Sequence, residues 1–440
     1  MVLANGWTTR QVDYTNAFTQ AELKEEVYIE PPKGFQRKDK KDLVLRLLKS
    51  LYGLKQAPKS FFDKLSQGLR DRGFVQSEID KCLFLKQDMV CIVCVDDTII
   101  AGPGSKAIDL LISNLGISDE EQRHSFDFRD EGEVGDFLGI RIEKSQAKKF
   151  TLTQSGLINK VLKETEMETC NSAKTPSSPV PLGKDEEGEP FNEKWEYANI
   201  VGMLMYLATN SRPDIAYAVN QCARFTHCTK QSHSTGIKRI LRYLKGTRTK
   251  GMHICPTNKY NMDCYVDADF AGLWGSENDQ DPVSVKSRTG FVVMFMGCPL
   301  LWMSKLQTQI ALSTMEAEYI ALSHSMRELI AIREVLKEIH INVLSKNAAD
   351  PEYSTNHNFG SIPQSTVFED NQACLKFASL PKMSPRTKHI AIPYHFFRSK
   401  VTNLEIKVTG VATHDQLSDQ FTKGLTQVMF ERARLNLMGW

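Results

Sequence analysis

The run MVCIVCVDDTIIAG, residues 89–102, decides how the first part of this chain folds. Both halves of the run are apolar, and Asp96 and Asp97 stand between them. Two short apolar runs joined by a polar turn predict a β-hairpin that carries two carboxylates at its tip. A carboxylate near the protein interior is costly unless it is paired or binds a cation, but aspartate is also common in hairpin turns. The run alone therefore leaves a metal site and a simple turn as alternatives.

The residues before this hairpin alternate between strand and helix patterns. RQVDYTNAF (10–18) is typical of a short strand that leads into a helix, and Asp13 lies where the two meet. Pro58 can begin a second helix, because apolar residues recur after it at helical spacing. Asp13 could serve as a helix N-cap. Alternatively, Asp13, Asp96 and Asp97 could together hold two magnesium ions for in-line attack on a phosphate.

The C-terminal part of the sequence holds a second set of carboxylates. MDCYVDADFAG (262–272) and RTGFVVMFM (288–296) predict two strands. Asp267 and Asp269 share one face of the first strand because they are two residues apart. Asp370 ends another short predicted strand, and Asp419 precedes FTKGL (421–425). A helix N-cap is the alternative role for Asp370 and for Asp419.

A long amphipathic helix, predicted from about residue 314, places one glutamate among apolar residues. Glu318 lies on the apolar stripe, which consists of Met315, Leu322, Met326, Leu329, Ile332, Leu336 and Ile339. Glu316 is about 200° away around the helix and is expected to face solvent. Since a glutamate within an apolar stripe is costly unless it has a function, Glu318 is the better candidate for a metal ligand.

Two stretches without apolar periodicity divide the sequence. Residues 171–194 are rich in proline, serine and acidic residues and predict a linker, and residues 341–366 predict a second long loop. We therefore expect a first domain at 1–170, a linker at 171–194, a helical region at 195–262 and a last domain at 263–440.

Composition and charge favour a soluble intracellular protein. The 440 residues are 41% hydrophobic and 25% charged, as in globular proteins, and the net charge is +2. The sequence shows no run long enough for a membrane span and no signal-peptide pattern at its start. Two local basic clusters, at 238–250 and 376–400, suit binding to a phosphate backbone, although a solvated helix face is the alternative.

Several long motifs resemble the Pol polyprotein of copia-type LTR retrotransposons. Similarity to its reverse transcriptase is carried by QVDYTNAF (11–18), SLYGLKQAP (50–58), VDDTIIAG (95–102) and FLGIRIE (137–143). Similarity to the region that follows is carried by RPDIAYAV (212–219) and KRILRYLKGT (238–247). Similarity to its ribonuclease H domain is carried by YVDADFAG (265–272), LSTMEAEYIALS (312–323), FEDNQACL (368–375) and QLSDQFTKGL (416–425). The motifs run in order through nearly the whole chain.

This resemblance implies an α+β reverse-transcriptase palm with partial fingers and a helical thumb, followed by a mixed α/β ribonuclease H-like domain. It implies an enzyme that is an RNA-directed DNA polymerase and an RNA–DNA hybrid ribonuclease. Both activities would use two-metal phosphoryl transfer, with two Mg²⁺ ions, or Mn²⁺, in each active site. The implied partners are an RNA template, a DNA primer, an RNA–DNA hybrid and deoxynucleoside triphosphates, and no membrane.

The motifs also imply roles for single residues. Asp13 and Asp96 match the main metal ligands of the polymerase, and Asp97 stands beside them. Gln56 matches the position that contacts the incoming nucleotide, and FLGIRIE matches the hairpin that grips the primer end. The four metal carboxylates of the ribonuclease H domain are matched by Asp267, Glu318, Asp370 and Asp419.

The sequence departs from the family in three places. Cys94 replaces the usual aromatic residue before the hairpin turn, and Ala391 replaces an acidic residue in KHIAIPYHFFR (388–398). Only 12 residues precede Asp13, so the upstream fingers strands, with their basic contacts to the triphosphate, are expected to be missing. The alternative hypothesis is a degenerate or domesticated retroelement fragment that binds nucleic acid and retains at most ribonuclease H activity. A binding-only protein should tolerate Asp267→Asn, whereas a nuclease should not.

Overall fold

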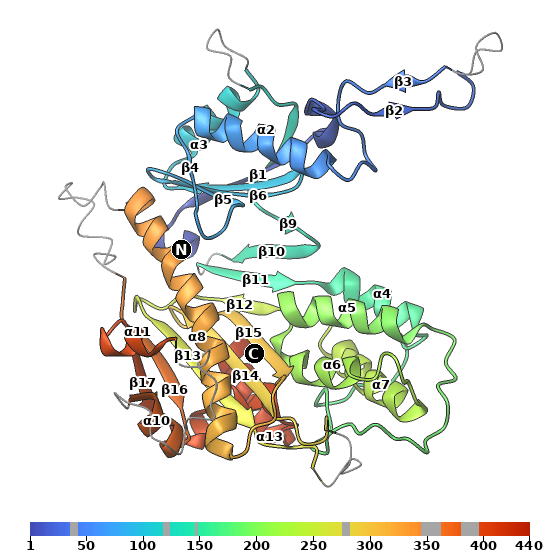
Figure 1. Cartoon of the computed structure of the whole chain (residues 1–440), viewed down its shortest axis with the longest axis vertical. Helices are drawn as coiled ribbons and strands as arrows, with labels where there is room; N and C mark the ends of the chain where they lie inside the picture. The colour runs from blue at the N-terminus through green and yellow to red at the C-terminus, as the bar shows by residue number, and fades with distance from the viewer. Residues whose placement is uncertain (36–42, 118–123, 146–147, 275–281, 345–361, 380–395) are drawn as a thin grey trace. The chain divides into compact units, whose positions relative to one another are not determined.

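The computed structural model describes residues 1–35, 43–117, 124–145, 148–274, 282–344, 362–379 and 396–440 of the chain (Figure 1). These residues form two compact units. The first comprises Met1–Val134 and Arg333–Ile362, and the second comprises Gly135–Ile332 and Pro363–Trp440. Across the described ranges, no helix combines the length and the apolar character that crossing a membrane would require.

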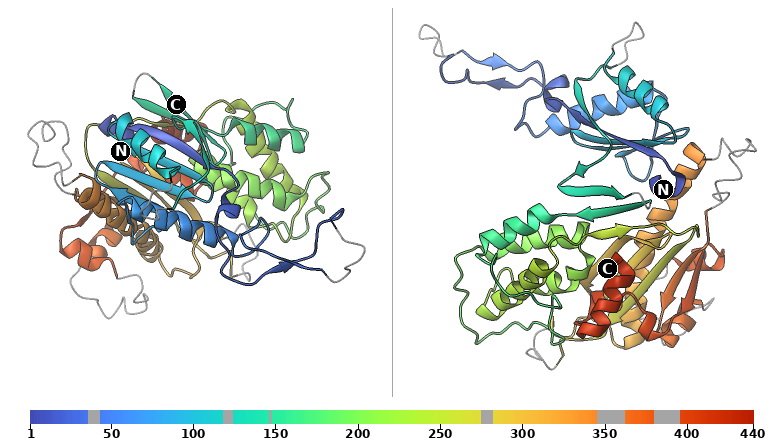
Figure 2. Two further views of the ribbon diagram at one scale, coloured as in Figure 1. Left: turned by 90° about the horizontal axis from the view of Figure 1, so that it is seen from above. Right: turned by 180° about the vertical axis from the view of Figure 1, so that it is seen from behind.

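A six-stranded antiparallel sheet organises the first unit. In spatial order its strands are β4 (Val75–Gln76), β5 (Leu83–Lys86), β6 (Met89–Cys94), β7 (Asp97–Gly102), β1 (Thr8–Tyr14) and β8 (Phe128–Gly132). Helices α2 (Ala57–Asp71) and α3 (Ser105–Leu115) lie on one face of this sheet (Figures 1 and 2). The predicted hairpin is confirmed as β6 and β7, which pair from Val90↔Ala101 to Cys94↔Asp97.

Residues at helical and strand spacing build the core between these helices and the sheet. Phe61, Leu65 and Leu69 of α2 are buried at every fourth position, and Pro58 lies in the first turn as predicted. The helix predicted after β1 is only a 3-10 turn, η1 (Ala17–Gln20), because the backbone becomes extended at Ala21. The remaining elements of this unit are α1 (Val2–Asn5), the ribbon of β2 (Tyr28–Ile29) and β3 (Leu45–Arg46), and the turn η3 (His340–Leu344).

The second unit begins with a four-stranded antiparallel sheet and a group of helices. The strands, in spatial order, are β12 (Met252–Ile254), β11 (Lys149–Thr153), β10 (Ile140–Ser145) and β9 (Asp136–Phe137). The predicted helical region is confirmed as α5 (Tyr197–Asn210), η2 (Pro213–Ile215), α6 (Ala216–Ala223) and α7 (Gln231–Gly246). Together with α4 (Ser155–Glu164), these helices share one apolar core.

A five-stranded mixed sheet completes the second unit. Its order is β15 (Cys298–Leu306), β14 (Arg288–Phe295), β13 (Met262–Asp269), β16 (Ser365–Glu369) and β17 (Ile406–Gly410). The first three strands are antiparallel, whereas β13, β16 and β17 are parallel. Helix α8 (Thr314–Ile339) runs along one face, and α13 (Gln427–Met438) lies on the other (Figures 1 and 2). Short helices α10 (Gln372–Ser379), α11 (Arg398–Thr402), η7 (Thr413–Asp415) and α12 (Asp419–Thr422) occupy the connections.

The segment 171–194, predicted as a linker, contains no named helix or strand but packs closely on its neighbours. Thr175 is buried, and Leu182 and Phe191 pack against the apolar core of α4–α7. The expected domain limits at 170, 194 and 262 remain predictions. Ala391, most of the loop predicted at 341–366 and most of the basic cluster at 376–400 lie outside the described residues.

Candidate metal centres

Two neighbouring parallel strands bring together the first carboxylates of the second unit. β13 and β16 pair in parallel, with Tyr265 opposite Phe368. Asp267 and Asp370 each follow two residues later, so both lie at the carboxyl ends of adjacent strands. Asp267 is buried and Asp370 is half-buried.

Helix α8 adds a third carboxylate near its start, on Glu318. Among the described residues, Asp267, Glu318 and Asp370 are the one group of three potential metal ligands whose ligand atoms all lie within 4.8 Å of one another. Glu318 is buried, and its Oε2 atom has no hydrogen-bond partner there. Mg²⁺ and Mn²⁺ prefer carboxylate oxygens, so this donor set, with a buried oxygen left unsatisfied, fits a divalent cation.

The short helix α12 brings Asp419 to this cluster by approaching β14 closely. Gly290 of β14 lies opposite Asp267 in the sheet. A Cβ atom at Gly290 would lie 2.6 Å from Thr422 Cγ2 and 2.8 Å from Phe421 Cβ, so a larger residue would push α12 away. Thr422 Oγ1 also donates a hydrogen bond to Asp267 Oδ2. The glycine in KSRTGF (286–291) therefore positions the fourth carboxylate.

Lys423, directly after α12, places a positive charge at the same site. Its Nζ atom lies 2.7 Å from Asp419 Oδ1 and 4.0 Å from Asp267 Oδ2. Sequence reasoning missed Lys423, Thr422 and Gly290, although each lies within a motif that was singled out.

Burial and mutual repulsion raise the pKa values of these carboxyl groups. Burial is the largest cause for Asp267, Glu318 and Asp419, and neighbouring carboxylates raise each pKa further. The pKa of Asp419 rises to about 7. Lys423 opposes the shift at Asp267 and Asp419. Without a bound cation, the cluster therefore retains protons that a metal ion would displace.

Two further glutamates differ from what the sequence predicts. The prediction that Glu316 faces solvent is wrong, because it is buried and its Oε2 accepts the Leu312 N–H at 2.9 Å where α8 begins. Glu369, which the sequence analysis missed, is fully buried, and its Oε1 accepts the Asn371 N–H at 3.0 Å. Alternation along β16 could have revealed Glu369, since it shares a face with the buried Val367.

The first unit holds the other predicted carboxylates. Asp13 of β1 lies directly opposite Asp97 of β7, and Asp96 occupies the turn before it, where Tyr14 N–H donates to Asp96 O at 3.0 Å. The pKa of Asp97 is raised by burial, and Asp96 and Asp13 add to the shift. These three carboxylates adjoin one another. In the described structure, however, their oxygen atoms do not all lie within 4.8 Å of one another.

The turn that presents Asp96 has an unusual backbone. Val95 adopts φ 57°, a left-handed conformation that β-branched residues rarely accept. Strained residues of this kind persist where the surroundings dictate the conformation, and they often occur at functional sites.

Gln56 lies at the N-terminus of α2, before Ala57. It lines a cavity of about 910 Å³ together with Lys59, Lys64 and other polar residues of α2. The structure thus places Gln56 beside a polar cavity with a basic lining.

The sequence is similar to known proteins over nearly its whole length. Residues 1–179 match the reverse transcriptase (RNA-dependent DNA polymerase) family. The chain is also 35% identical over 429 residues to the retrovirus-related Pol polyprotein from transposon RE1 of Arabidopsis thaliana, covering 97% of this chain and 27% of that protein. The predicted resemblance to copia-type Pol polyproteins is confirmed. It is similarly 32% identical over 435 residues to the Pol polyprotein from transposon TNT 1-94 of Nicotiana tabacum, covering 96% of this chain and 30% of the relative.

The chain spans between about a quarter and a third of the length of these relatives. Its reverse transcriptase match includes Asp13, Gln56, Asp96 and Asp97. Cys94, which departs from the family pattern, is half-buried at the end of β6 and pairs with Asp97.

FLGIRIE (137–143) forms the hairpin β9–β10. Phe137 pairs with Ile140, and the two residues between them, Leu138 and Gly139, both have positive φ. That pattern is typical of a tight type I′ turn. Tyr206 of α5 donates a hydrogen bond to Leu138 O at 2.5 Å, so the helical region supports the hairpin tip.

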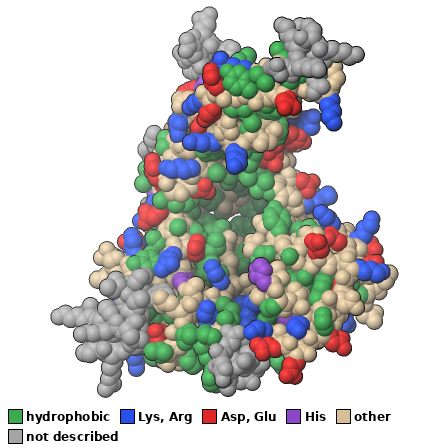
Figure 3. Space-filling view, turned by 45° about the vertical axis from the view of Figure 1, so that its right-hand side comes forward, with side chains coloured by type: hydrophobic (Ala, Val, Ile, Leu, Met, Phe, Trp, Pro, Cys, Tyr) green, Lys and Arg blue, Asp and Glu red, His purple; other side chains and the backbone are tan. Residues whose placement is uncertain are grey.

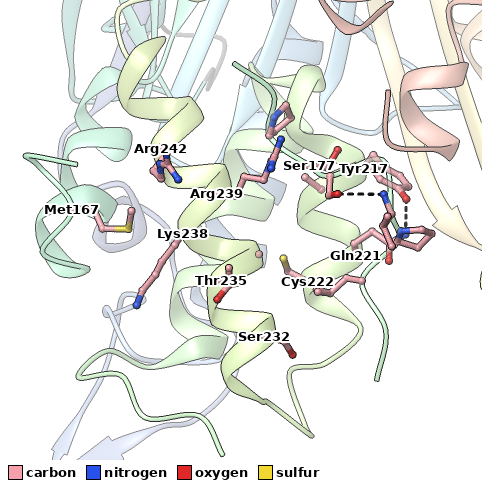
Figure 4. Close-up of a pocket in the computed structure, with 17 residues that line it drawn as sticks. Met167, Ser177, Tyr217, Gln221, Cys222, Ser232, Thr235, Lys238, Arg239 and Arg242 are labelled. Atoms are coloured by element: carbon pink, nitrogen blue, oxygen red, sulfur yellow. Dashed lines mark hydrogen bonds between the residues drawn. The ribbon is translucent and has the colours of Figure 1, made fainter. Parts of the chain in front are cut away.

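The basic residues of α7 bind the chain itself. Lys238 pairs with Glu193 at 2.6 Å, Arg239 donates to Thr175 Oγ1 at 2.7 Å, and Arg242 donates to Asn171 O at 2.8 Å. Figure 4 shows these three side chains along α7, where they line a cavity of about 480 Å³ with residues of the 176–182 segment. On the face drawn in Figure 3, basic and acidic side chains of the described residues are interspersed. Part of the cluster predicted to bind phosphate thus holds the segment 171–193 in place.

Proposed function

We propose that residues 263–440 cleave the RNA strand of an RNA–DNA hybrid, and that residues 1–170 carry out RNA-directed DNA synthesis, with 195–262 as the helical thumb. The observation that carries the proposal is the convergence of Asp267, Glu318 and Asp370 within 4.8 Å from three separate elements. Paired cations held by carboxylates suit phosphodiester chemistry, because they can stabilise both the attacking and the leaving oxygen.

In the ribonuclease site, four carboxylates would hold the divalent cations: Asp267, Glu318, Asp370 and Asp419. When bound, the cations would activate the attacking oxygen and neutralise charge on the scissile phosphate. The chain's own residues fix the ligands. Thr422 orients Asp267 by a hydrogen bond, and Gly290 lets α12 deliver Asp419. Glu318 offers an unsatisfied buried oxygen that needs no rearrangement of hydrogen bonds to bind a cation.

In the polymerase site, Asp13 and Asp96 would hold the cations, and Asp97 would complete the carboxylate set. Two observations support this proposal: the opposition of Asp13 and Asp97 across β1 and β7, and the match of residues 1–179 to reverse transcriptases. Gln56 would contact the incoming deoxynucleoside triphosphate from the polar cavity beside α2. The hairpin β9–β10, supported by Tyr206, would hold the primer end.

The substrates proposed are an RNA template, a DNA primer and the hybrid that synthesis produces. A hybrid is recognised mainly by backbone shape and by the 2′-hydroxyl groups of its RNA strand. Such recognition requires no base-specific contacts, so we expect cleavage at many sequences.

A second candidate is a chain that retains ribonuclease H activity but has lost polymerase activity. One observation favours it: Asp267, Glu318 and Asp370 of the second unit converge within 4.8 Å. Among the described residues, the three polymerase carboxylates do not form such a group.

Primer extension on an RNA template separates the two candidates. Asp96→Asn should lower extension at least about 100-fold if the polymerase is active, because it removes a cation ligand. Asp71→Asn, at an exposed position at the end of α2, is the matched control and should extend normally. If the unaltered chain extends no primer but cleaves a hybrid, the ribonuclease-only candidate replaces the two-activity proposal.

A further inference from the structure

Lys423 occupies an unusual position beside the carboxylate cluster of the second unit. Its Nζ atom contacts Asp419 Oδ1 at 2.7 Å and lies 4.0 Å from Asp267 Oδ2. Asp419 Oδ1 is buried and receives no hydrogen bond of good geometry. The ammonium group of Lys423 is therefore the partner on which this oxygen depends.

The charges at the site are strongly unbalanced without Lys423. Four carboxylates, and the buried Glu369 beside them, face one another at short range. Within the described ranges, Lys423 is the one lysine or arginine that forms an ion pair with this cluster. Like charges at such distances repel unless a proton or a cation intervenes.

The side chain of Lys423 is also placed so that its ammonium group can move away from the two carboxylates. It is 45% exposed, whereas the side chains of Asp267 and Asp419 are each 7% exposed. Lys423 follows the end of α12 in an extended backbone conformation. A lysine side chain has a flexible four-carbon stem, so its ammonium group can move into solvent without any change in the backbone.

The cluster is asymmetric with respect to Lys423. Asp267, Glu318 and Asp370 converge within 4.8 Å, and the ion pairs of Lys423 are to Asp419 and Asp267. A cation bound among Asp267, Glu318 and Asp370 need not remove the ammonium group from Asp419. A cation held by Asp267 and Asp419 together would take the place of the ammonium group.

We propose that Lys423 is the resident counter-ion of this cluster: it holds Asp419 and Asp267 together in the cation-free site and competes with the divalent cation that binds between them. Lys423 thereby makes that position the weaker of the two cation positions. The inference rests on the proposed metal-binding role of the cluster, but it concerns binding and not cleavage.

The test is a Mn²⁺ titration, followed by the electron paramagnetic resonance signal of free Mn²⁺. Asp13→Asn and Asp96→Asn are present in every protein, so that only the second unit's cluster is titrated. Lys423→Gln should tighten the weaker class of Mn²⁺ roughly tenfold, since the lost charge is half exposed and partly screened. Lys423→Arg should retain the competition. Lys407→Gln, on the exposed face of β17 in the same sheet, should change nothing.

A second measurement uses the chain with Lys423 intact. Saturating Mg²⁺ should release the ammonium group, so acetylation of Lys423, followed by mass spectrometry, should become faster relative to Lys407. The inference would be overturned if Lys423→Gln bound Mn²⁺ no more tightly than the protein that keeps Lys423. It would also be overturned if Mg²⁺ did not change the rate of acetylation of Lys423. If Asp267→Asn removes no Mn²⁺ binding, the proposed function itself is overturned.

Discussion

At the scale of single residues, the carboxyl groups of the second unit behave differently from ordinary aspartates and glutamates. Burial raises the pKa of Asp419 to about 7, well above the 3.8 of a free aspartate, and it also raises the pKa of Asp267 and Glu318. The folded state therefore binds more protons than the unfolded state between these pH values. Stability that comes from these groups is present at low pH and is lost as pH rises through the folded pKa.

The upward direction of these pKa shifts predicts how the stability of the metal-free protein responds to pH. In a chelator, the free energy of unfolding should fall by a few kcal/mol as the pH rises from about 5 to 8, at roughly 1.4 kcal/mol per unit of pKa shift. Asp419→Asn should flatten this dependence, and Mg²⁺ should reduce it by replacing the protons. Urea unfolding at both pH values measures the effect. An identical pH dependence in the unaltered chain and in Asp419→Asn would contradict the assignment.

At the scale of elements, the close contact of α12 with β14 makes a sharp prediction. Gly290→Ala should destabilise the protein by about 1–3 kcal/mol, because the added methyl overlaps Thr422 and Phe421. The same change should weaken Mn²⁺ binding, since Asp419 moves with α12. Gly202→Ala in α5 is the control: its Cβ meets open space, so it should stabilise the helix by roughly 0.5–1 kcal/mol. Equal effects of the two substitutions on Mn²⁺ affinity would show that α12 is not held by this contact.

A buried ion pair joins the elements of the helical region. Arg212 donates two hydrogen bonds to the Asp214 carboxylate, at 2.9 and 2.8 Å, and Tyr243 of α7 donates a third at 2.6 Å. Both charged side chains are at most 1% exposed.

Removal of one partner leaves a buried charge without compensation. Asp214→Ala should therefore cost about 3–5 kcal/mol of unfolding free energy, measured in urea. Asp415→Ala breaks the exposed pair with Arg432 and should cost less than about 1 kcal/mol. Similar losses of unfolding free energy for the two substitutions would mean that burial does not determine how much the Arg212–Asp214 pair stabilises the protein.

Elements with strong periodicity could be predicted from the sequence, and elements set by tertiary contact could not. The phase of α8 predicted the burial of Glu318, because four residues separate it from Leu322 along one stripe. The same reasoning failed for Glu316, whose position in the first turn lets it bond to the preceding loop. The helix predicted after β1 is only a 3-10 turn, because the backbone becomes extended at Ala21 and local periodicity does not reveal this.

At the scale of the whole chain, the carboxylates that converge are separated by many residues. Asp267, Glu318, Asp370 and Asp419 come from two strand ends and two helices, and no spacing in the sequence shows that these meet. Their residue types and local settings could be predicted, and the resemblance to copia-type Pol proteins grouped them. The contributions of Gly290, Thr422 and Lys423 depend on packing between distant segments and emerged from the structure alone.

The most direct test of the central claim, that the carboxylate cluster of the second unit cleaves RNA, is a gel of a labelled RNA strand annealed to DNA. The chain, its Asp267→Asn variant and its Asp263→Asn variant are compared with Mg²⁺ and with chelator. Asp263 lies on the same strand outside the cluster, so the two variants are matched. We expect Mg²⁺-dependent cleavage that Asp267→Asn abolishes and Asp263→Asn preserves. Binding of the hybrid without cleavage by any of the three proteins would contradict the claim and favour a chain that only binds nucleic acid.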